Sequence, residues 1–302
     1  MSSIAQKTYT ATTPLKVAFL GLGAMGYPMA GHLQRAGFDV TVYNRNPAKA
    51  QTWVEEFGGR SATNPSLAVH GADIVLACVG NDDSLREVTY GENGAFQGMK
   101  IDSIFVDHTT TSAEVAKEVA AQAQARGLHF IDAPVSGGQA GAINGVLTVM
   151  CGGEESAFNR AKPVIDTFAR SVVLLGPHGS GQLCKMVNQI CIAGLVQGLA
   201  EAIAFGERTG LDMKQVLDVV SKGAAQSWQM ENRGPTMLQN KFDFGFAVDW
   251  MRKDLGLVFD EAKRNGAKLP VTELVDSFYA QIQENGNNRM DTSSLITLLK
   301  KA

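Results

Sequence analysis

The stretch that most constrains the fold of this chain is residues 17–26, where an apolar run of strand type, Val17–Leu20, leads directly into three spaced glycines. A helical pattern follows the motif Gly21-x-Gly23-x-x-Gly26 at once. Gly21 permits a tight turn, Gly23 lets the backbone approach a diphosphate, and Gly26 allows the helix to pack closely on the strand. Free N–H groups at the helix N-terminus can then hold the diphosphate. Such motifs also arise by chance in a chain with 32 glycines, but the flanking strand and helix predict a dinucleotide site. The residues expected to bind the cofactor here are Gly21, Leu22, Gly23, Ala24, Met25 and Gly26.

Length and composition limit the class of protein. A chain of 302 residues suggests about two domains, and 45% hydrophobic with 19% charged residues is typical of a soluble globular protein. The formal net charge of −3 argues against a nucleic-acid-binding surface. The four cysteines form no C-x-x-C pair, and no His/Cys cluster has metal-ligand spacing. We therefore expect a reduced, cytoplasmic protein with no metal site and no nucleic-acid partner.

Two segments resemble targeting or membrane elements at first sight. Residues 1–14 are rich in Ser and Thr and lack the apolar core of a signal peptide, so we expect a disordered lead-in. The apolar stretch Ile190–Phe205 is interrupted by Gln197 and Glu201, so we expect a buried helix there and no membrane partner.

The first half of the chain alternates strand and helix patterns. The expected strands are Val17–Leu20, Val40–Tyr43, Ile74–Val79, Ile104–Asp107, Leu128–Ile131, Leu147–Cys151 and Val172–Leu175. The helical patterns between them include Pro28–Ala36, Pro47–Phe57 and Ser112–Arg126. This alternation implies right-handed crossovers and a mostly parallel sheet.

Beyond Gly179 only helical patterns remain, beginning with a run of almost thirty residues, Gln182–Thr209. The others are Met213–Lys222, Asp249–Asn265, Val271–Glu284 and Ser293–Lys300. The predicted fold is therefore α/β, with a Rossmann-type doubly wound sheet over residues 15–178. A long linking helix and an all-α substrate and oligomerisation domain follow over residues 179–302.

The segment after the second strand indicates which nicotinamide cofactor binds. An NAD site usually has an acidic residue there, which accepts hydrogen bonds from the ribose 2′-hydroxyl. This chain has Asn44 and Arg45 and no Asp or Glu. A guanidinium attracts a 2′-phosphate, and Asn44 can add a hydrogen bond. NADP(H) is therefore expected, with NAD(H) still possible. The alternative is that Arg45 is only a solvated surface charge.

Two further segments carry groups suited to carbonyl chemistry. Ser136 with Gly137 and Gly138 offers a hydroxyl and exposed backbone N–H groups that can hold a carboxylate, although a plain turn has the same composition. Lys185, near the start of the long helix, can give a proton to a carbonyl oxygen during reduction. Asn188 and Gln189 share its helix face. A solvated helical lysine is the commoner case, and the same applies to the pair Lys253-Asp254.

As a set, these segments resemble the β-hydroxyacid dehydrogenase family, which includes 3-hydroxyisobutyrate dehydrogenases, tartronate semialdehyde reductases and glyoxylate/succinic semialdehyde reductases. The resemblance covers nearly all of residues 15–300. The motifs, in the family's order, are Gly-Leu-Gly-x-Met-Gly at 21–26, Asp-Ala-Pro-Val-Ser-Gly-Gly at 132–138, Gly-x-Gly-x-x-x-Lys-x-x-Asn at 179–188 and Lys-Asp-Leu at 253–255.

The resemblance implies a role for each matching residue. Lys185 would be the catalytic acid/base. Substrate would be bound by Ser136, Gly137, Gly138, Asn188 and Gln189. The nicotinamide cofactor would be contacted by Asn44, Arg45, Val79, Thr110 and Lys253. The implied activity is metal-free, NADP-dependent interconversion of a small 3-hydroxy acid and its semialdehyde or keto acid, in a homodimer or homotetramer.

Departures from the family pattern lie around the expected pocket and leave the substrate open. His108 and Thr109 replace a Met-Ser type pair, and Cys78-Val-Gly80 replaces a frequent Leu-Pro turn. Two alternatives remain, an imine reductase and a non-catalytic NADP-binding sensor or interaction protein. Relatives of both kinds tend to lack the lysine that this chain has at position 185.

Overall fold

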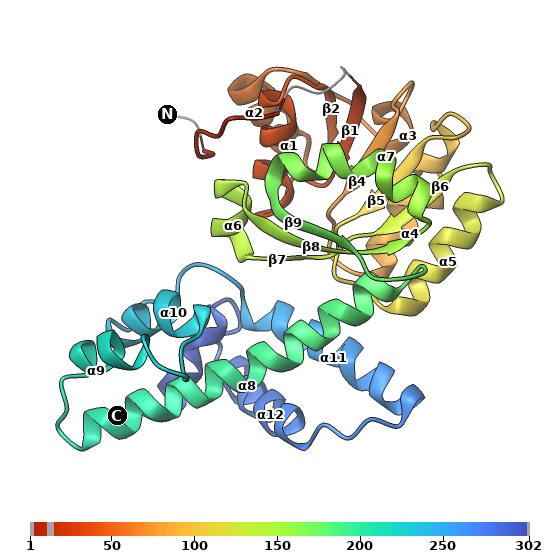
Figure 1. The fold of residues 1–302 in the computed structure, drawn as a ribbon. Helices are drawn as coiled ribbons and strands as arrows, with labels where there is room; N and C mark the ends of the chain where they lie inside the picture. The colour runs from red at the N-terminus through yellow and green to blue at the C-terminus, as the bar shows by residue number, and fades with distance from the viewer. Residues whose placement is uncertain (1–2, 11–14, 301–302) are drawn as a thin grey trace. The chain divides into compact units, whose positions relative to one another are not determined.

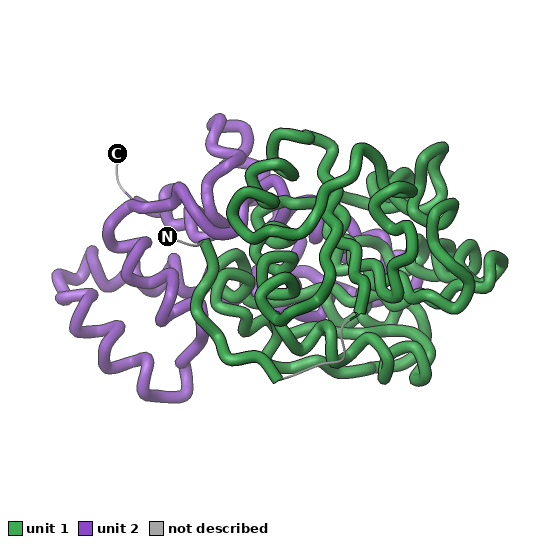
Figure 2. The backbone as a smooth tube through the Cα atoms, turned by 90° about the horizontal axis from the view of Figure 1, so that it is seen from above, with its two compact units in different colours: residues 1–185 green, residues 186–302 purple. Residues whose placement is uncertain are grey.

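The computed structural model describes residues 3–10 and 15–300 of the chain. Its contacts divide the chain into two compact units, residues 1–185 and 186–302, each described by itself below (Figure 2). This division falls within the long helix α8 (Ser180–Arg208), whereas the sequence analysis began the second domain at residue 179.

The first unit is built on one nine-stranded sheet (Figure 1). Its strands are β1 (Lys16–Leu20), β2 (Asp39–Tyr43), β3 (Arg60–Ser61), β4 (Ile74–Ala77), β5 (Ile104–Asp107), β6 (His129–Asp132), β7 (Val135–Ser136), β8 (Leu147–Gly153) and β9 (Ala169–Leu174). The order is β3-β2-β1-β4-β5-β6-β8-β7, with β9 paired to β8. Pairing is parallel from β3 to β6 and between β8 and β9, and antiparallel where β8 meets β6 and β7. From β1, the strands β2 and β3 are added on one side of the sheet, and β4, β5 and β6 on the other. Ligands of doubly wound folds bind at the point between β1 and β4 where this order reverses.

Helices cover both faces of this sheet. They are α1 (Gly26–Arg35), α2 (Pro47–Phe57), α3 (Pro65–Ala68), α4 (Asp82–Tyr90), α5 (Ala113–Gln124), α6 (Gly138–Asn144) and α7 (Glu155–Ile165), with 3₁₀ turns η1 (Ala95–Gln97) and η2 (Asp166–Phe168). Successive strand side chains point to opposite faces, so Phe19 packs in one core with Trp53 of α2, whereas Leu20 packs in the other with Val115 of α5. Both faces are apolar, as expected of a parallel sheet buried on each side.

The helices begin where polar side chains cap them. Asn46 accepts a hydrogen bond from Ala48 N at the start of α2, and Asn81 accepts one from Ser84 N at the start of α4. Ser112 does the same for Val115 N in α5. Each such cap contributes about 1 kcal/mol. Each capping residue lies only a few positions after the strand that precedes its helix. The loops at the carboxyl ends of these strands are therefore short.

The described part of the N-terminal segment, residues 3–10, lies against the first unit, whereas the sequence predicts disorder for residues 1–14. Lys7 Nζ donates to the carbonyl oxygens of Gly145 and Thr167, at 2.7 and 3.0 Å. Tyr9 Oη lies 2.7 Å from His32 Nδ1. Residues 1–2 and 11–14 lie outside the described residues.

The second unit is helical. After the C-terminal part of α8 it contains α9 (Met213–Val220), α10 (Trp228–Leu238), α11 (Val248–Asn265), α12 (Pro270–Glu284) and the 3₁₀ helix η3 (Thr292–Leu298). The predicted order of a doubly wound sheet, a long helix and a helical domain is therefore confirmed. The sequence pattern does not predict α10, because Gly234 and Pro235 lie inside it. A side chain at Gly234 would come within 2.9 Å of Leu217, so the glycine allows α9 and α10 to pack closely.

Helix α8 is the one helix of residues 3–10 and 15–300 that is long and apolar enough to cross a membrane. Half of its most apolar 18-residue window is buried inside the structure. A core helix of a folded domain meets the same criterion, so this finding alone carries no argument for a membrane.

Candidate active site

The glycine loop between β1 and α1 shows three different steric demands. Gly21 has φ of +95°, and a Cβ there would lie 2.3 Å from the carbonyl oxygen of Cys78. A Cβ on Gly26 would lie 1.9 Å from Gly21 O, so only glycine lets α1 approach the loop. A Cβ on Gly23, in contrast, would have no neighbour within 4 Å. The backbone at Gly23 is therefore open to a ligand, as a diphosphate site requires.

A cavity of about 280 Å³ adjoins this open backbone. Its lining includes Gly23 and Ala24 of the loop, Lys49 of α2 and Ser3 of the N-terminal segment. The combination of exposed backbone and a lysine ammonium fits a phosphorylated ligand. The residues present thus fit the diphosphate of a dinucleotide, through open backbone at Gly23 and a positive charge at Lys49.

The turn after β2 contains Asn44 and Arg45. Asn44 Oδ1 accepts a hydrogen bond from Leu22 N at 2.9 Å, and its Nδ2 donates to Asn46 O at 3.0 Å. The amide of Asn44 therefore ties the glycine loop to this turn, a role that the sequence analysis did not foresee. Arg45 is exposed beside it. Direct contact of either residue with a cofactor stays a prediction.

The loops that follow β4 and β5 are joined by hydrogen bonds at the carboxyl edge of the sheet. Val79 N donates to Thr109 Oγ1 at 2.9 Å, and Thr109 N donates to Asp107 Oδ1 at 3.0 Å. Burial raises the pKa of Asp107 to about 7. Two of the residues expected to contact the cofactor, Val79 and Thr110, thus lie on loops held together by Thr109.

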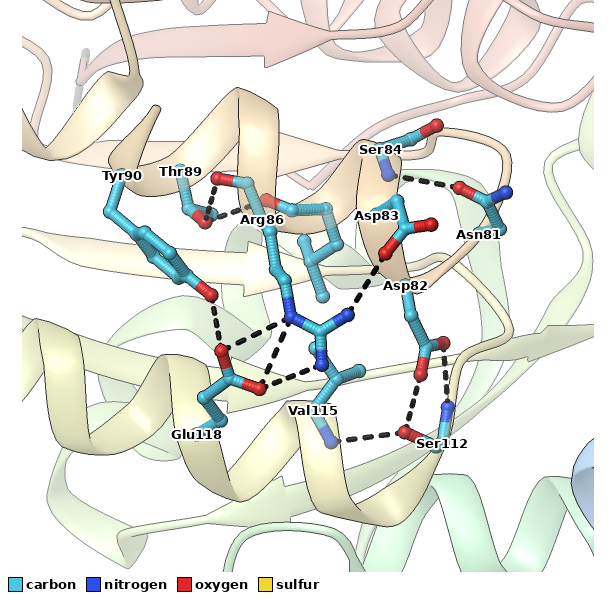
Figure 3. A network of polar contacts seen from close by, with 11 residues as sticks. Asn81, Asp82, Asp83, Ser84, Arg86, Thr89, Tyr90, Ser112, Val115 and Glu118 are labelled. Carbon is cyan, nitrogen blue, oxygen red and sulfur yellow. Dashed lines mark hydrogen bonds and ion pairs between the residues drawn. The ribbon is translucent and has the colours of Figure 1, made fainter. Parts of the chain in front are cut away.

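A polar network also links the two helices that follow these loops, α4 and α5 (Figure 3). Asp82 accepts hydrogen bonds from Ser112 N at 3.0 Å and Ser112 Oγ at 2.5 Å. Arg86 pairs with Glu118 at 2.8 Å, and Tyr90 Oη also donates to Glu118. These hydrogen bonds lower the pKa of Glu118. The pairs are partly exposed, so each adds little stability, but together they keep the two helices in register.

The segment predicted to bind a carboxylate lies at the end of β7. Gly137 and Gly138 have φ of +126° and +60°, a conformation that other residues rarely adopt. A Cβ on Gly138 would have no neighbour within 4 Å. Ser136 is half-buried beside them. The structure thus presents a hydroxyl next to uncovered backbone, the combination that the carboxylate prediction requires.

Lys185 is buried, with 7% of its surface exposed, in the second turn of α8. The start of α8 is anchored by Asp132, whose carboxylate accepts hydrogen bonds from Gly179 N at 2.7 Å and Gln182 N at 3.1 Å. Burial raises the pKa of Asp132 to about 6, and the two N–H groups oppose this shift. The alternative reading of Lys185, a solvated helical lysine, is therefore not what the structure shows. Asp132 stands in the motif at 132–138, but its partners are known only from the fold.

The second unit brings Asn188, Gln189 and Lys253 into one cluster through Asp254. Gln189 Nε2 donates to Asp254 Oδ2 at 2.7 Å, and Lys253 Nζ lies 3.0 Å from Asp254 Oδ1. Asn188 Nδ2 donates to Gln189 Oε1 at 2.8 Å. Asp254 is 2% exposed. The sequence analysis treated Asp254 only as part of a charge pair and missed this central position.

Among residues 3–10 and 15–300, no group of three His, Cys, Asp or Glu side chains could hold a metal ion.

The first unit brings the glycine loop, the β4–α4 and β5–α5 loops and the start of α8 to one sheet edge. Asn188, Gln189 and Lys253 belong to the second unit.

Comparison with family models places both parts of the chain. Residues 16–176 match the NAD binding domain of 6-phosphogluconate dehydrogenase. Residues 179–299 match the NAD-binding domain of NADP-dependent 3-hydroxyisobutyrate dehydrogenase. A nicotinamide cofactor is thus supported by both models.

Individual relatives agree over almost the whole chain. An uncharacterised oxidoreductase of Shewanella frigidimarina is 61% identical, covering 95% of this chain and 99% of its own. The 2-hydroxy-3-oxopropionate reductase of Escherichia coli is 33% identical over 95% of this chain and 97% of its own. The solved structure of Mycobacterium tuberculosis 3-hydroxyisobutyrate dehydrogenase superposes with a TM-score of 0.86 at 30% identity, over 96% of this chain and all of that one. The chain therefore belongs to the β-hydroxyacid dehydrogenase family and is an NAD(P)-dependent oxidoreductase of the 3-hydroxyisobutyrate dehydrogenase type.

Proposed function

We propose that this protein interconverts a small 3-hydroxy acid and its semialdehyde or keto acid, with NADP(H) as cofactor and Lys185 as the acid/base. The observation that carries this proposal is the burial of Lys185 at the start of α8, where Asp132 anchors the helix. A lysine that served only as a solvated surface charge would not be buried to this extent.

The proposed chemistry requires a proton at the oxygen and a hydride at the carbon. A bound nicotinamide cofactor supplies or accepts the hydride. In the reductive direction the Lys185 ammonium donates a proton to the carbonyl oxygen and stabilises the negative charge that develops there. In the oxidative direction the neutral amine takes the proton from the hydroxyl. Burial excludes water from the amine, which strengthens both interactions.

The proposed substrate carries a carboxylate because Ser136, Gly137 and Gly138 suit that group. The open backbone at Gly138 lets N–H groups approach a ligand, and the Ser136 hydroxyl can donate to a carboxylate oxygen. The relatives named above act, by their names, on 3-hydroxyisobutyrate and on 2-hydroxy-3-oxopropionate, two small acids of this kind. We propose the same substrate class here.

The proposed preference for NADP(H) is based on the turn after β2. Arg45 is exposed there, and the residues next to it in the sequence include no Asp or Glu. A guanidinium pairs with a 2′-phosphate through two donors, whereas a carboxylate at this place would repel it. Lys49, which lines the adjoining cavity, adds a second positive charge.

The decisive experiment is a comparison of the wild type with Lys185→Ala and Lys185→Arg. NADPH oxidation is followed with glyoxylate, succinic semialdehyde, tartronate semialdehyde and a cyclic imine. We expect both variants to bind NADPH nearly normally and to lose at least about 100-fold in kcat, the lower end of the range for general acid catalysis. Arginine keeps the charge but does not release its proton, so it should not rescue turnover.

The matched control is Lys263→Ala, an exposed helical lysine paired with Asp260 at 3.1 Å. It should retain wild-type turnover. Near-normal kcat in Lys185→Ala would reject the catalytic role. Reduction of the imine alone would favour an imine reductase, and tight NADPH binding without oxidation of any substrate would favour a sensor.

A further inference from the structure

We infer that Gln182 is a positioning residue, which holds the loop carrying Thr110 in a set place relative to the helix that carries Lys185. The inference rests on the proposed function, because it assigns Gln182 a task in the same reaction. All the contacts that carry it lie within the first unit.

The side chain of Gln182 is fully buried and uses both ends of its amide. Its Oε1 accepts a hydrogen bond from Thr111 N at 3.1 Å, and its Nε2 donates to Thr109 O at 2.8 Å. These two partners are the backbone groups on either side of Thr110. A leucine or methionine side chain would fill the same space but would leave both backbone groups without this partner. What distinguishes glutamine at position 182 is therefore its pair of hydrogen bonds and not its volume.

The backbone of Gln182 is held equally firmly from the other side. Its N–H donates to Asp132 Oδ2, at the end of β6. The preceding residue, Gly181, lies so close to the sheet that a Cβ there would come within 2.3 Å of Met150 O and 2.8 Å of Asp132 Oδ2. The first turn of α8 therefore has no room to slide along the sheet edge.

Lys185 follows Gln182 by three residues, which places both on the same side of α8, one turn apart. A single rigid helical turn thus connects the amine with the Thr109–Thr111 backbone. Thr109 extends the connection, because its hydroxyl accepts the hydrogen bond from Val79 N. The side chain of Gln182 thus connects the helix of the proposed proton donor with both loops expected to contact the cofactor.

This arrangement matters because displacement by about 1 Å of a reacting group can cost about 100-fold in rate. In Gln182→Leu the side-chain volume is similar, but Thr109 O and Thr111 N lose their partner and the loop can move away from α8. We expect the rate of hydride transfer to fall by about 10- to 100-fold. Binding of NADPH and the substrate KM should change by less than about threefold, because the phosphate and carboxylate sites are untouched.

The test is single-turnover stopped-flow at 340 nm, with enzyme and NADPH in excess over glyoxylate or succinic semialdehyde, whichever the wild type reduces faster. The observed rate constant at saturation does not depend on the fraction of active enzyme, whereas the steady-state rate per total enzyme does. A merely structural role of Gln182 would lower the steady-state rate per total enzyme and leave the single-turnover rate constant unchanged. A positioning role lowers the rate constant itself.

Two further variants complete the design. Gln182→Met keeps the unbranched shape of glutamine but pairs neither Thr111 N nor Thr109 O, so its rate constant should fall to that of Gln182→Leu. It also gives a second measurement if the leucine variant does not fold. Gln197→Leu is the matched control, since Gln197 is a buried glutamine of the same helix whose Nε2 donates to Glu201 at 2.8 Å. It should keep the wild-type rate constant.

The outcomes separate the two proposals. Equal rate constants for the Gln182 variants and Gln197→Leu, together with an inactive Lys185→Ala, would overturn the positioning role and leave the proposed function intact. Near-normal turnover of Lys185→Ala would overturn the proposed function, and the positioning role would fall with it.

Discussion

At the scale of single residues, the carboxyl group of Asp107 is the most unusual feature of the sheet edge. It is fully buried, and its Oδ2 has no hydrogen-bond partner among residues 3–10 and 15–300. Its Oδ1 accepts a hydrogen bond from Thr109 N. Burial raises its pKa from 3.8 to about 7, because the charged form is poorly solvated there.

The raised pKa of Asp107 predicts a pH dependence of stability with a definite sign. The folded protein binds this proton more tightly than the unfolded chain does. The contribution to stability is therefore fully present below the unfolded pKa of 3.8 and is lost as the pH rises through about 7. The slope is at most about 1.4 kcal/mol per pH unit.

Asp107→Asn removes this titration while keeping the shape of the side chain. The melting temperature of the wild type, relative to that of the variant, should fall as the pH rises from 4 to 8. Burial lowers the pKa of His108 from 6.5 to about 4. The contribution of His108 to the stability of the protein therefore changes in the opposite sense and is lost as the pH falls from 6.5. Because both proteins contain His108, it cancels in the comparison. A difference that is constant over this pH range would contradict the prediction.

At the scale of elements, the start of α8 depends on Gly181, where helix, β6 and β8 meet. Alanine normally stabilises a helix by about 1 kcal/mol relative to glycine. At position 181, however, the added Cβ would lie 2.3 Å from Met150 O and 2.7 Å from Asp132 O, both of which are backbone atoms. The steric term should therefore outweigh the propensity term.

Gly181→Ala and Gly198→Ala form a matched pair on this helix. Gly198 has no atom within 4 Å of the position of a Cβ, so alanine there should be neutral or raise stability by up to about 1 kcal/mol. Gly181→Ala should lower the melting temperature by several degrees and reduce turnover. Thermal melts of the two variants measure the contrast, and equal melting temperatures would show that α8 can shift on the sheet.

At the scale of the whole molecule, cofactor preference should be visible as a difference in stability. A ligand that binds the folded state at 100 times its Kd stabilises it by about 2.7 kcal/mol. If Arg45 pairs with a 2′-phosphate, NADPH should raise the melting temperature more than an equal concentration of NADH does. The variant Arg45→Gln should reduce the NADPH shift to the level of NADH.

The control for this measurement is Arg126→Gln, an exposed arginine just beyond the C-terminal end of α5, whose guanidinium donates hydrogen bonds to Gln122. Its two thermal shifts should equal those of the wild type. A larger shift with NADH than with NADPH in the wild type would refute the proposed preference.

Elements with strong local signals were predicted closely. Helix α2 spans Pro47–Phe57 as predicted, because Asn46 caps it, Pro47 suits its first turn and glycines follow it. The 3₁₀ helix η3 was predicted as an α-helix, and α10 was not predicted, because propensity within a segment does not report the packing around it.

The residues of the candidate site also fall into two groups, those that the sequence indicates and those that only the fold reveals. Local motifs pointed to the glycine loop, whereas the roles of Lys185 and the Ser136–Gly138 segment came from the resemblance to the family, since spacing alone fits a solvated lysine and a plain turn equally well or better. These roles stay predictions. Asp254 and Gln182 were missed as site residues. Asp254 pairs with Gln189, 65 positions away, and Gln182 pairs with Thr109 and Thr111, 73 and 71 positions away.

The amino-acid sequence by itself determined where the chain turns, where helices start and which residues can approach a diphosphate, since these are local demands on backbone conformation. Only the tertiary structure decided which buried polar groups become partners. A buried amide or carboxylate must find a hydrogen bond wherever the fold supplies one, and that choice depends on which distant strands end at the same edge of the sheet.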